Sequence, residues 1–333
     1  MSTASPLAAN ESLLRVRGLK TWFPLRQGLL QRARTWVRAV DGVDLDLDAG
    51  TTLALVGESG CGKTTVGRTL LGLERAQAGS ISFGGRELVG LPEREFRPLR
   101  QRIQLIFQDP GAALDPRMRI GDAIAEGPRS FGATRHEQLT CTLELLERVG
   151  LDASMTERWP HQLSGGQRQR VCIARALALE PEVLVCDEAT SALDVSVQAQ
   201  ILNLLADLQR ERGLAYLFIT HDLALVRHFA DRVAVMYLGR IVEQGPVARV
   251  FERPAHPYTR ALLAAAPTLD PDRRGRVRPL SGDLPSVLSP PSGCPFHPRC
   301  PEVLTDRCNR EIPADVAVPG GGTARCLLDP ARA

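Results

Sequence analysis

The stretch at residues 53–65, Leu-Ala-Leu-Val-Gly-Glu-Ser-Gly-Cys-Gly-Lys-Thr-Thr, constrains the fold of this chain more than any other feature. Four apolar residues lead into a turn that matches G-x-x-x-x-G-K-[ST] over residues 57–64, a strand–loop–helix pattern that binds phosphate. Its glycines let successive backbone N–H groups point at a polyphosphate, and the helix start adds positive charge. The pattern predicts an α/β P-loop NTPase in which Lys63 reaches the β- and γ-phosphates and the Thr64 hydroxyl ligates Mg²⁺. The loop residues predicted to bind nucleotide are Gly57, Glu58, Ser59, Gly60, Cys61, Gly62, Lys63, Thr64 and Thr65.

Length, charge and cysteine content narrow the class of protein. A chain of 333 residues with 44% hydrophobic residues is long enough for about two domains with a sizeable core. The net charge of only +3 argues against a nucleic-acid surface, so no nucleic-acid partner is expected. No apolar run reaches the length of a membrane-spanning helix, and the first ten residues lack the pattern of a secretory signal. We therefore expect a cytosolic chain whose eight cysteines form no structural disulfides.

Three further apolar strands are followed by polar residues of a catalytic kind. Gln108 ends one, Asp187 and Glu188 end the second, and His221 follows the third. Ligands of open α/β sheets bind beyond the carboxyl ends of the strands, so these residues are expected at one edge with Gly57. Because strand alternation aims Asp187 and Glu188 differently, one can hold Mg²⁺ while the other polarises the attacking water. Singly, each could be an ordinary strand-end residue.

Residues 112–178 have helical apolar spacing in three segments, which predicts a helical insert in the α/β sheet. The last of these helices is preceded by the sequence Leu-Ser-Gly-Gly-Gln at residues 163–167. A serine followed by two glycines at a helix start can cap the helix and also donate to a phosphate. The chain thus has two helix starts of the phosphate-binding kind.

In their order, these segments resemble the ATP-binding subunits of ABC transporters, from about residue 13 to the end of the chain. The resemblance implies a RecA-like core with an antiparallel β-subdomain and a helical subdomain. It implies that Glu188 is the general base, that His221 senses the γ-phosphate, and that Asp187 and Gln108 complete the Mg²⁺ environment. Phe23, rather than Trp22, occupies the place of the aromatic that stacks on adenine. The nucleotide would lie between the phosphate loop of one subunit and a segment of the facing subunit that includes Ser164, Gly165, Gly166, Gln167 and Asp194.

Residues 254–263 and 293–301 look like the C-terminal region of oligopeptide and dipeptide importer ATPases, and the start of the chain is similar to their F-type subunit. This resemblance implies a heterodimer with a D-type ATPase, two transmembrane permease subunits and an extracytoplasmic substrate-binding protein. It places the chain peripherally at the cytoplasmic face of the inner (plasma) membrane. The cargo would be di- or oligopeptides, with nickel, glutathione or another small solute as alternatives. The expected division is a loose terminus (1–12), a nucleotide-binding domain (13–255) and a C-terminal extension (256–333).

Four cysteines crowd into the last 40 residues with the spacing C-x5-C-x7-C-x17-C; they are Cys294, Cys300, Cys308 and Cys326. The surrounding sequence is rich in proline and glycine and has little apolar periodicity, so a metal centre could organise it. Four thiolates suit zinc or a [4Fe–4S] cluster, although the spacing lacks the C-x2-C of zinc ribbons. Four reduced thiols are the plain alternative. The resemblance to peptide importers favours the iron–sulfur cluster.

Two rival functions use the same sequence features. An ABC ATPase that works in repair or on ribosomes without pumping anything usually has two nucleotide domains or a long coiled coil, and the sequence shows neither. A metal-binding sensor with vestigial ATPase activity would not need the intact pair Asp187 and Glu188. We therefore expect a transporter ATPase.

Overall fold

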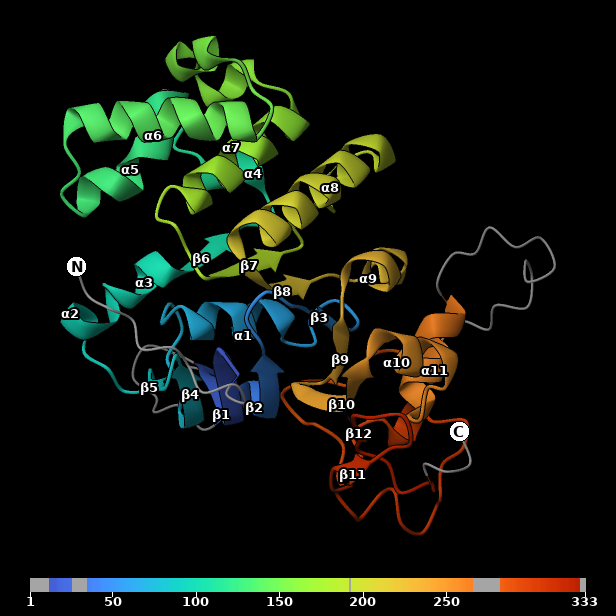
Figure 1. Cartoon of the computed structure of the whole chain (residues 1–333). Coiled ribbons are helices and arrows are strands. Elements are labelled where there is room, and N and C mark those ends of the chain that lie inside the picture. The colour runs from blue at the N-terminus through green and yellow to red at the C-terminus, as the bar shows by residue number, and fades with distance from the viewer. Residues whose placement is uncertain (1–11, 26–34, 192, 266–281, 330–333) are drawn as a thin grey trace. The chain divides into compact units, whose positions relative to one another are not determined.

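The computed structural model describes residues 12–25, 35–191, 193–265 and 282–329 (Figure 1). The chain divides into two compact units. The first comprises Met1–Asp48, Thr52–Gly90 and Thr220–Ala333, and the second comprises Ala49–Thr51 and Leu91–Ile219. Most of the expected loose terminus, residues 1–12, lies outside the described residues. The expected domain boundaries stay a prediction.

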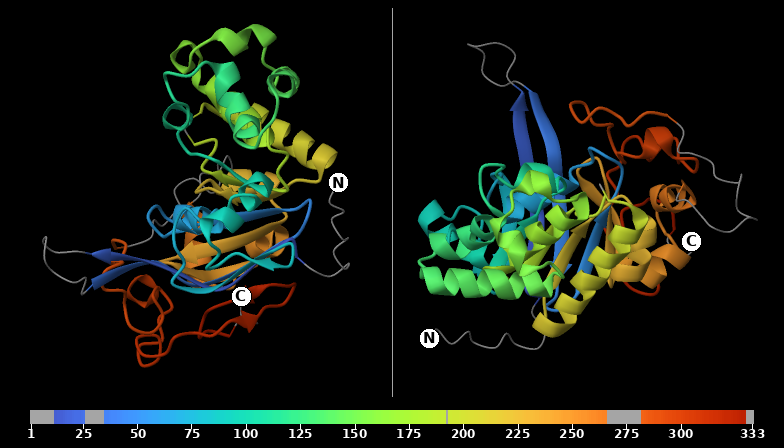
Figure 2. Two further views of the ribbon diagram at one scale, coloured as in Figure 1. Left: turned by 90° about the vertical axis from the view of Figure 1, so that its left-hand side faces the viewer. Right: turned by 90° about the horizontal axis from the view of Figure 1, so that it is seen from above.

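The first unit contains an antiparallel sheet with the order β2-β1-β4-β5. Its strands are β1 (Leu14–Leu25), β2 (Thr35–Leu47), β4 (Ala78–Phe83) and β5 (Arg86–Glu87). Apolar and charged residues alternate at the start of β1, so Val16 is buried while Arg15 and Arg17 are exposed. β1 continues to Leu25, where it still pairs with β2 (Figure 2). Cross-strand pairing thus makes the Trp22–Phe23 segment part of this strand.

A second sheet of the first unit carries the phosphate loop. Within this unit its strands run in the order β3-β9-β10-β12-β11, with β3 and β9 parallel and the other pairs antiparallel. They are β3 (Thr52–Val56), β9 (Arg232–Tyr237), β10 (Arg240–Pro246), β11 (Val316–Ala317) and β12 (Thr323–Ala324). Every residue of β3 is buried, as its unbroken apolar sequence predicts. The helices of this unit are α1 (Lys63–Leu70), α9 (Leu223–Phe229), α10 (Val247–Glu252), α11 (Pro257–Ala265) and the 3₁₀ helix His297–Arg299.

The C-terminal segment, residues 282–329, packs on the core of the first unit, next to α10 and α11 (Figure 1). Phe296 is fully buried in the same apolar cluster as Tyr237 and Tyr258. Arg249 forms a buried ion pair with Glu243, and its Nε donates to the Gly321 carbonyl oxygen of the segment at 3.1 Å. The segment therefore obtains its apolar packing from the unit on which it lies, which the sequence pattern alone did not indicate.

His256, directly before α11, is buried, and this gives a prediction about the stability of the protein in acid. His256 is 1% exposed, and its Nδ1 accepts the Tyr258 N–H at 3.0 Å. Burial, and then the positive charge of Arg260, lower the pKa of His256 from 6.5 to about 3. Between these pH values the unfolded chain therefore binds a proton that the folded chain excludes. The free energy of unfolding should decrease as the pH is lowered from about 6.5 to about 3. We expect this group to contribute at most about 1.4 kcal/mol per pH unit.

The measurement is the free energy of unfolding in urea at several pH values between 7.5 and 4.5. His256→Gln should remove this part of the pH dependence, whereas His136→Gln, at an exposed position of α6 (Arg135–Arg148), should leave it in place. Equal slopes for wild type and His256→Gln would contradict the assignment.

The second unit is built on the parallel strands β6 (Ile103–Ile106), β7 (Val183–Asp187) and β8 (Ala215–Ile219), with β7 in the middle. All residues of β7 and β8 are buried. Its helices are α2 (Glu93–Phe96), α3 (Leu99–Arg102), α4 (Pro110–Ala113), α5 (Ile120–Ser130), α6 (Arg135–Arg148), α7 (Gly165–Leu177) and α8 (Val195–Arg212), with 3₁₀ helices at Ala153–Glu157 and Pro160–Gln162.

Local turns set two element boundaries in the second unit. The helical spacing that begins at residue 112 is interrupted between α4 and α5, where the Asp115 carboxylate accepts the Arg117 N–H at 2.9 Å and forms a turn. β6 is short, because α3 ends directly before it and Pro110 starts α4 soon after it. Among the residues that the structure describes, no helix has both the length and the apolar character needed to cross a membrane.

Candidate functional site

The residues predicted for the nucleotide site divide between the two units. The phosphate loop, Phe23 and His221 belong to the first unit, and those from Gln108 to Asp194 belong to the second. Most of them lie at or next to strand ends and helix starts, whereas Phe23 lies within β1.

Close packing around the phosphate loop explains its glycines. A Cβ atom on Gly62 would lie 2.0 Å from the Ala39 carbonyl oxygen, and one on Gly57 would lie 2.2 Å from that of Met236. Gly62 also has a φ of 108° where α1 begins, a left-handed conformation that side chains disfavour. The neighbouring backbone therefore fixes the curl of the loop between β3 and α1.

Lys63 is already held inside this loop. Its Nζ donates to the carbonyl oxygens of Gly57 at 2.9 Å and Glu58 at 3.0 Å, and the residue is 5% exposed. The Cys61 thiol is also buried, which raises its pKa and keeps it neutral. The loop thus presents one cation, Lys63, held in place by its own backbone.

The other predicted residues of the first unit are Phe23 and His221. Phe23 is half-buried in β1 opposite Val37 of β2. The neighbouring Trp22 ring has Lys20 and Arg38 over it, at 5.7 and 5.0 Å from its centroid, so cations already cover Trp22. His221 is exposed, and the Thr220 N–H before it donates to Leu55 of β3 at 3.2 Å.

In the second unit, Gln108 and Glu188 are brought together although 80 residues separate them. The Gln108 Nε2 donates to the Glu188 Oε2 at 3.0 Å. Glu188 has a φ of 47°, a strained conformation for a residue with a side chain, and such strain gathers at functional sites. Asp187, the last residue of β7, is 6% exposed. The two carboxylates thus differ in exposure, with Asp187 buried and Glu188 half-buried.

The helix start at Ser164 forms a complete capping box. The Ser164 Oγ accepts the Gln167 N–H at 3.2 Å, and the Gln167 side chain accepts the Ser164 N–H at 3.0 Å. A Cβ on Gly166 would lie 2.7 Å from a Val197 methyl carbon, so this glycine lets α7 approach α8 closely. Asp194 caps α8 by accepting the Val197 N–H at 2.9 Å, and a hydrogen bond from Ser196 lowers the pKa of its carboxyl.

Sequence reasoning missed two residues that contact the phosphate loop, Tyr258 and Arg299. The Tyr258 hydroxyl accepts the Glu58 N–H, and Arg299 forms a two-pronged ion pair with the Glu58 carboxylate. Both lie in segments that were interpreted only as marks of a transporter branch. No local pattern could have joined them to a loop that precedes them by 200 and 241 residues.

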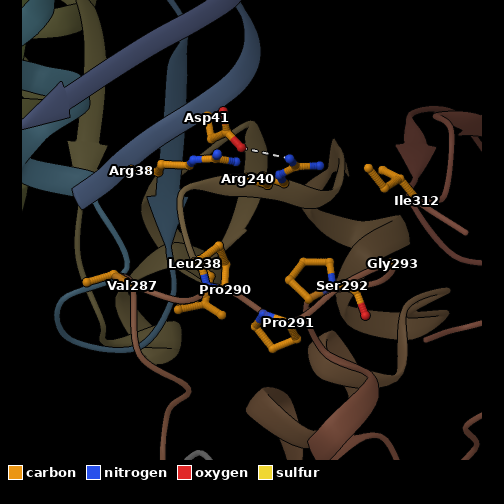
Figure 3. A pocket seen from close by; sticks show the side chains of 11 residues that line it. Arg38, Asp41, Leu238, Arg240, Val287, Pro290, Pro291, Ser292, Gly293 and Ile312 are labelled. Carbon is orange, nitrogen blue, oxygen red and sulfur yellow. Dashed lines mark hydrogen bonds and ion pairs between the residues drawn. The ribbon is translucent and has the colours of Figure 1, made fainter. Parts of the chain in front are cut away.

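A cavity of about 230 Å³ also lies in the first unit (Figure 3). Arg38, Asp41, Arg240 and several prolines line it, and the Arg240 guanidinium donates to Asp41 at 2.7 Å. None of the predicted nucleotide-binding residues lines this cavity. It is therefore not the nucleotide site.

The predicted iron–sulfur cluster is wrong, and so is its zinc alternative. Among the residues that the structure describes, no group of three or more cysteine, histidine, aspartate or glutamate side chains is placed to hold a metal ion. All four C-terminal cysteines are free, and burial raises the pKa of Cys294 and of Cys300 to about 11, so these two are neutral thiols. Cys294 and Cys308 instead pack in the apolar core, which organises the segment in place of a metal.

Comparison with known proteins identifies the family. Residues 40–191 match the family described as "ABC transporter", and residues 242–308 match "Oligopeptide/dipeptide transporter, C-terminal region". The chain is 49% identical to the probable peptide ABC transporter ATP-binding protein y4tS of Sinorhizobium fredii, covering 95% of this chain and 90% of that protein. It is 48% identical to the di/tripeptide transport ATP-binding protein DppF of Pseudomonas aeruginosa, covering 91% and 94%.

A solved structure supports the same fold. The dimeric post-hydrolysis state of the ATP-binding cassette MJ0796 bound to ADP and Pi matches 70% of this chain and 98% of its own, with a TM-score of 0.63 and 26% identity. The fold is thus that of an ABC-type P-loop ATPase with mixed α/β sheets.

The predicted heterodimer with a D-type ATPase is a second correction. The relatives are named as ordinary ATP-binding proteins, and the dimeric structure is that of one cassette. Neither supports a second type of ATPase as the partner. The expectation of a transporter ATPase is confirmed over almost the whole chain, against the repair, ribosome and sensor alternatives. The chain belongs to the ATP-binding subunits of ABC transporters, in their oligopeptide/dipeptide importer branch, and is an ATPase.

Proposed function

We propose that both groups of site residues act on one MgATP and that its hydrolysis drives the uptake of di- or oligopeptides. The observation that carries the proposal is the hydrogen bond between Gln108 and Glu188 beside the buried Asp187, since a carboxylate held next to a second carboxylate suits a base that activates water near a metal ion. The peptide cargo is supported by the printed names of the two relatives and by the matching C-terminal region.

The phosphate loop and its partners bind the nucleotide. Backbone N–H groups of the phosphate loop and the Lys63 ammonium hold the phosphates, and Phe23 stacks on adenine. Thr64, Gln108 and Asp187 offer hydroxyl, amide and carboxylate oxygens, which is the donor chemistry that Mg²⁺ prefers. When bound there, Mg²⁺ would neutralise charge on the phosphates.

Hydrolysis then needs a base and a sensor for the γ-phosphate. Glu188 accepts a proton from a water whose oxygen bonds to the γ-phosphorus, and the bond from that phosphorus to the β–γ bridging oxygen breaks to release ADP. The Gln108 amide keeps the Glu188 carboxylate in place. His221, at the exposed end of its strand, contacts the γ-phosphate.

A facing protomer completes the site. The helix start at residues 164–167 donates to the nucleotide of the other protomer, with Asp194 beside it as a hydrogen-bond acceptor, so that ATP joins two ATPase domains. We infer that the chain works peripherally at the cytoplasmic face of the membrane with two permease subunits and an extracytoplasmic substrate-binding protein.

The cargo is tested by uptake of a labelled tripeptide in cells that lack this gene. Cells with the wild-type gene should take up the tripeptide, and cells with Glu188→Gln should not. Unlabelled dipeptides should compete, while nickel and glutathione should not. Wild-type uptake in the cells that lack the gene, or competition by nickel alone, would contradict peptide import. Permease subunits should co-purify with the affinity-tagged chain.

A further inference from the structure

The Glu58 carboxylate lies within the phosphate loop itself, where a negative charge opposes the binding of a triphosphate. In this structure Arg299 binds it through two parallel hydrogen bonds, at 2.7 Å from Nη1 and 3.0 Å from Nη2. The Arg299 side chain is only 5% exposed, and that of Glu58 is 27% exposed. The hydrogen bonds from Arg299 to Glu58 also raise the pKa of the guanidinium. A paired, largely dehydrated geometry of this kind holds both charges in place.

A second contact fixes the backbone of the same residue. The Glu58 N–H donates to the Tyr258 hydroxyl at 3.0 Å, and Tyr258 is fully buried. The Tyr258 ring packs against Tyr237 and Phe296, with centroids 4.7 and 5.3 Å apart, and the Arg299 Nη1 lies 3.4 Å from the Tyr237 hydroxyl. One aromatic cluster thus supports both groups that hold Glu58.

We infer that Arg299 and Tyr258 are positioning residues of the ATPase: they fix the phosphate loop through Glu58, and Arg299 cancels the charge that Glu58 would present to the triphosphate. The inference rests on the proposed nucleotide site. It gives the C-terminal segment a part in ATP binding, because Arg299 belongs to that segment and its partner belongs to the loop. The position of Glu58 also affects Lys63, because the Lys63 Nζ donates to the Glu58 carbonyl oxygen.

The charge argument predicts effects of opposite sign for two variants of the full-length protein. Arg299→Met leaves the Glu58 carboxylate uncompensated, so the Kd for MgATP should rise by about tenfold. Glu58→Gln keeps the side-chain shape and leaves Arg299 positive, so the Kd should fall by about threefold. The double variant should return to within about threefold of wild type. Isothermal titration with MgATP measures these Kd values.

Arg307→Met is the matched control, because Arg307 lies in the same segment and pairs with Glu311 at the surface, at 2.7 Å. Its Kd should equal that of wild type. A Kd for Arg299→Met within twofold of wild type, or a double variant as weak as Arg299→Met, would overturn the inference. Weaker binding by Glu58→Gln would overturn the inference by itself.

Lys63→Ala separates this inference from the proposed site. One outcome is that Lys63→Ala removes MgATP binding while Arg299→Met and Glu58→Gln do not change the Kd in opposite directions. In that case only the role of Arg299 and Tyr258 fails. If Lys63→Ala binds MgATP like wild type, the proposed nucleotide site fails, and the inference fails with it.

Discussion

Replacing Glu188 with glutamine is expected to lower kcat for ATP hydrolysis by about 10²- to 10⁴-fold while MgATP binding is kept. Glutamine preserves the size of the side chain and can still bond Gln108, but it cannot accept the proton of the attacking water. The unhydrolysed nucleotide should then hold two protomers together. Steady-state hydrolysis and size-exclusion chromatography with MgATP measure the two effects.

Glu182→Gln is the matched control for this variant. Glu182 lies next to the opposite end of β7 and pairs with Arg102, at 2.9 Å from Nη2, in a half-exposed position. Its kcat should stay within about twofold of wild type. Turnover by Glu188→Gln at the wild-type rate would remove the role that we propose for Glu188.

Replacing Lys63 with alanine should raise the Kd for MgATP by about 100-fold or more, since a buried, hydrogen-bonded charge that faces a triphosphate is lost. The Lys63 ammonium is held by two carbonyl oxygens, so its position is fixed before the nucleotide arrives. Hydrolysis should be lost together with binding. Titration with a fluorescent ATP analogue gives the Kd.

The chain contains one other lysine, Lys20, which makes a natural control. Lys20 lies in β1, 5.7 Å from the centroid of the Trp22 ring, and Lys20→Ala should change the Kd by less than threefold. Comparable losses in both variants would mean that charge in general, not the loop lysine, binds the nucleotide.

Local patterns predicted the strands and helix starts that present the site. The phosphate loop could be recognised because close backbone approach at Gly57 and Gly62 permits only glycine, and the strand end at Asp187 follows from a buried apolar run. Gln108 lies two residues after the end of β6. The pairing that brings Gln108 to Glu188 was predicted only as a shared sheet edge. Its hydrogen bond needs the parallel alignment of β6 with β7, which no local pattern contains.

Contacts over long sequence separations account for what was missed. Arg299 and Glu58 are 241 residues apart, and nothing near either residue signals the other. The spacing of the four C-terminal cysteines was overinterpreted for a related reason. The spacing shows only that the four thiols are close in sequence. Whether a thiol such as Cys294 stays neutral depends on its burial in an apolar core that other strands help to form.

The capping box at Ser164 bears on how the proposed pair of protomers would reset. The Ser164 Oγ accepts the Gln167 N–H within its own helix, and its O–H can still donate to a neighbour's phosphate, so both bonds can exist together. The bond to phosphate replaces a bond to water and would contribute about 1.5–3 kcal/mol. In the proposed pair, loss of the γ-phosphate would remove this bond while the capping box keeps the helix start formed, so the two protomers would separate without any refolding of α7.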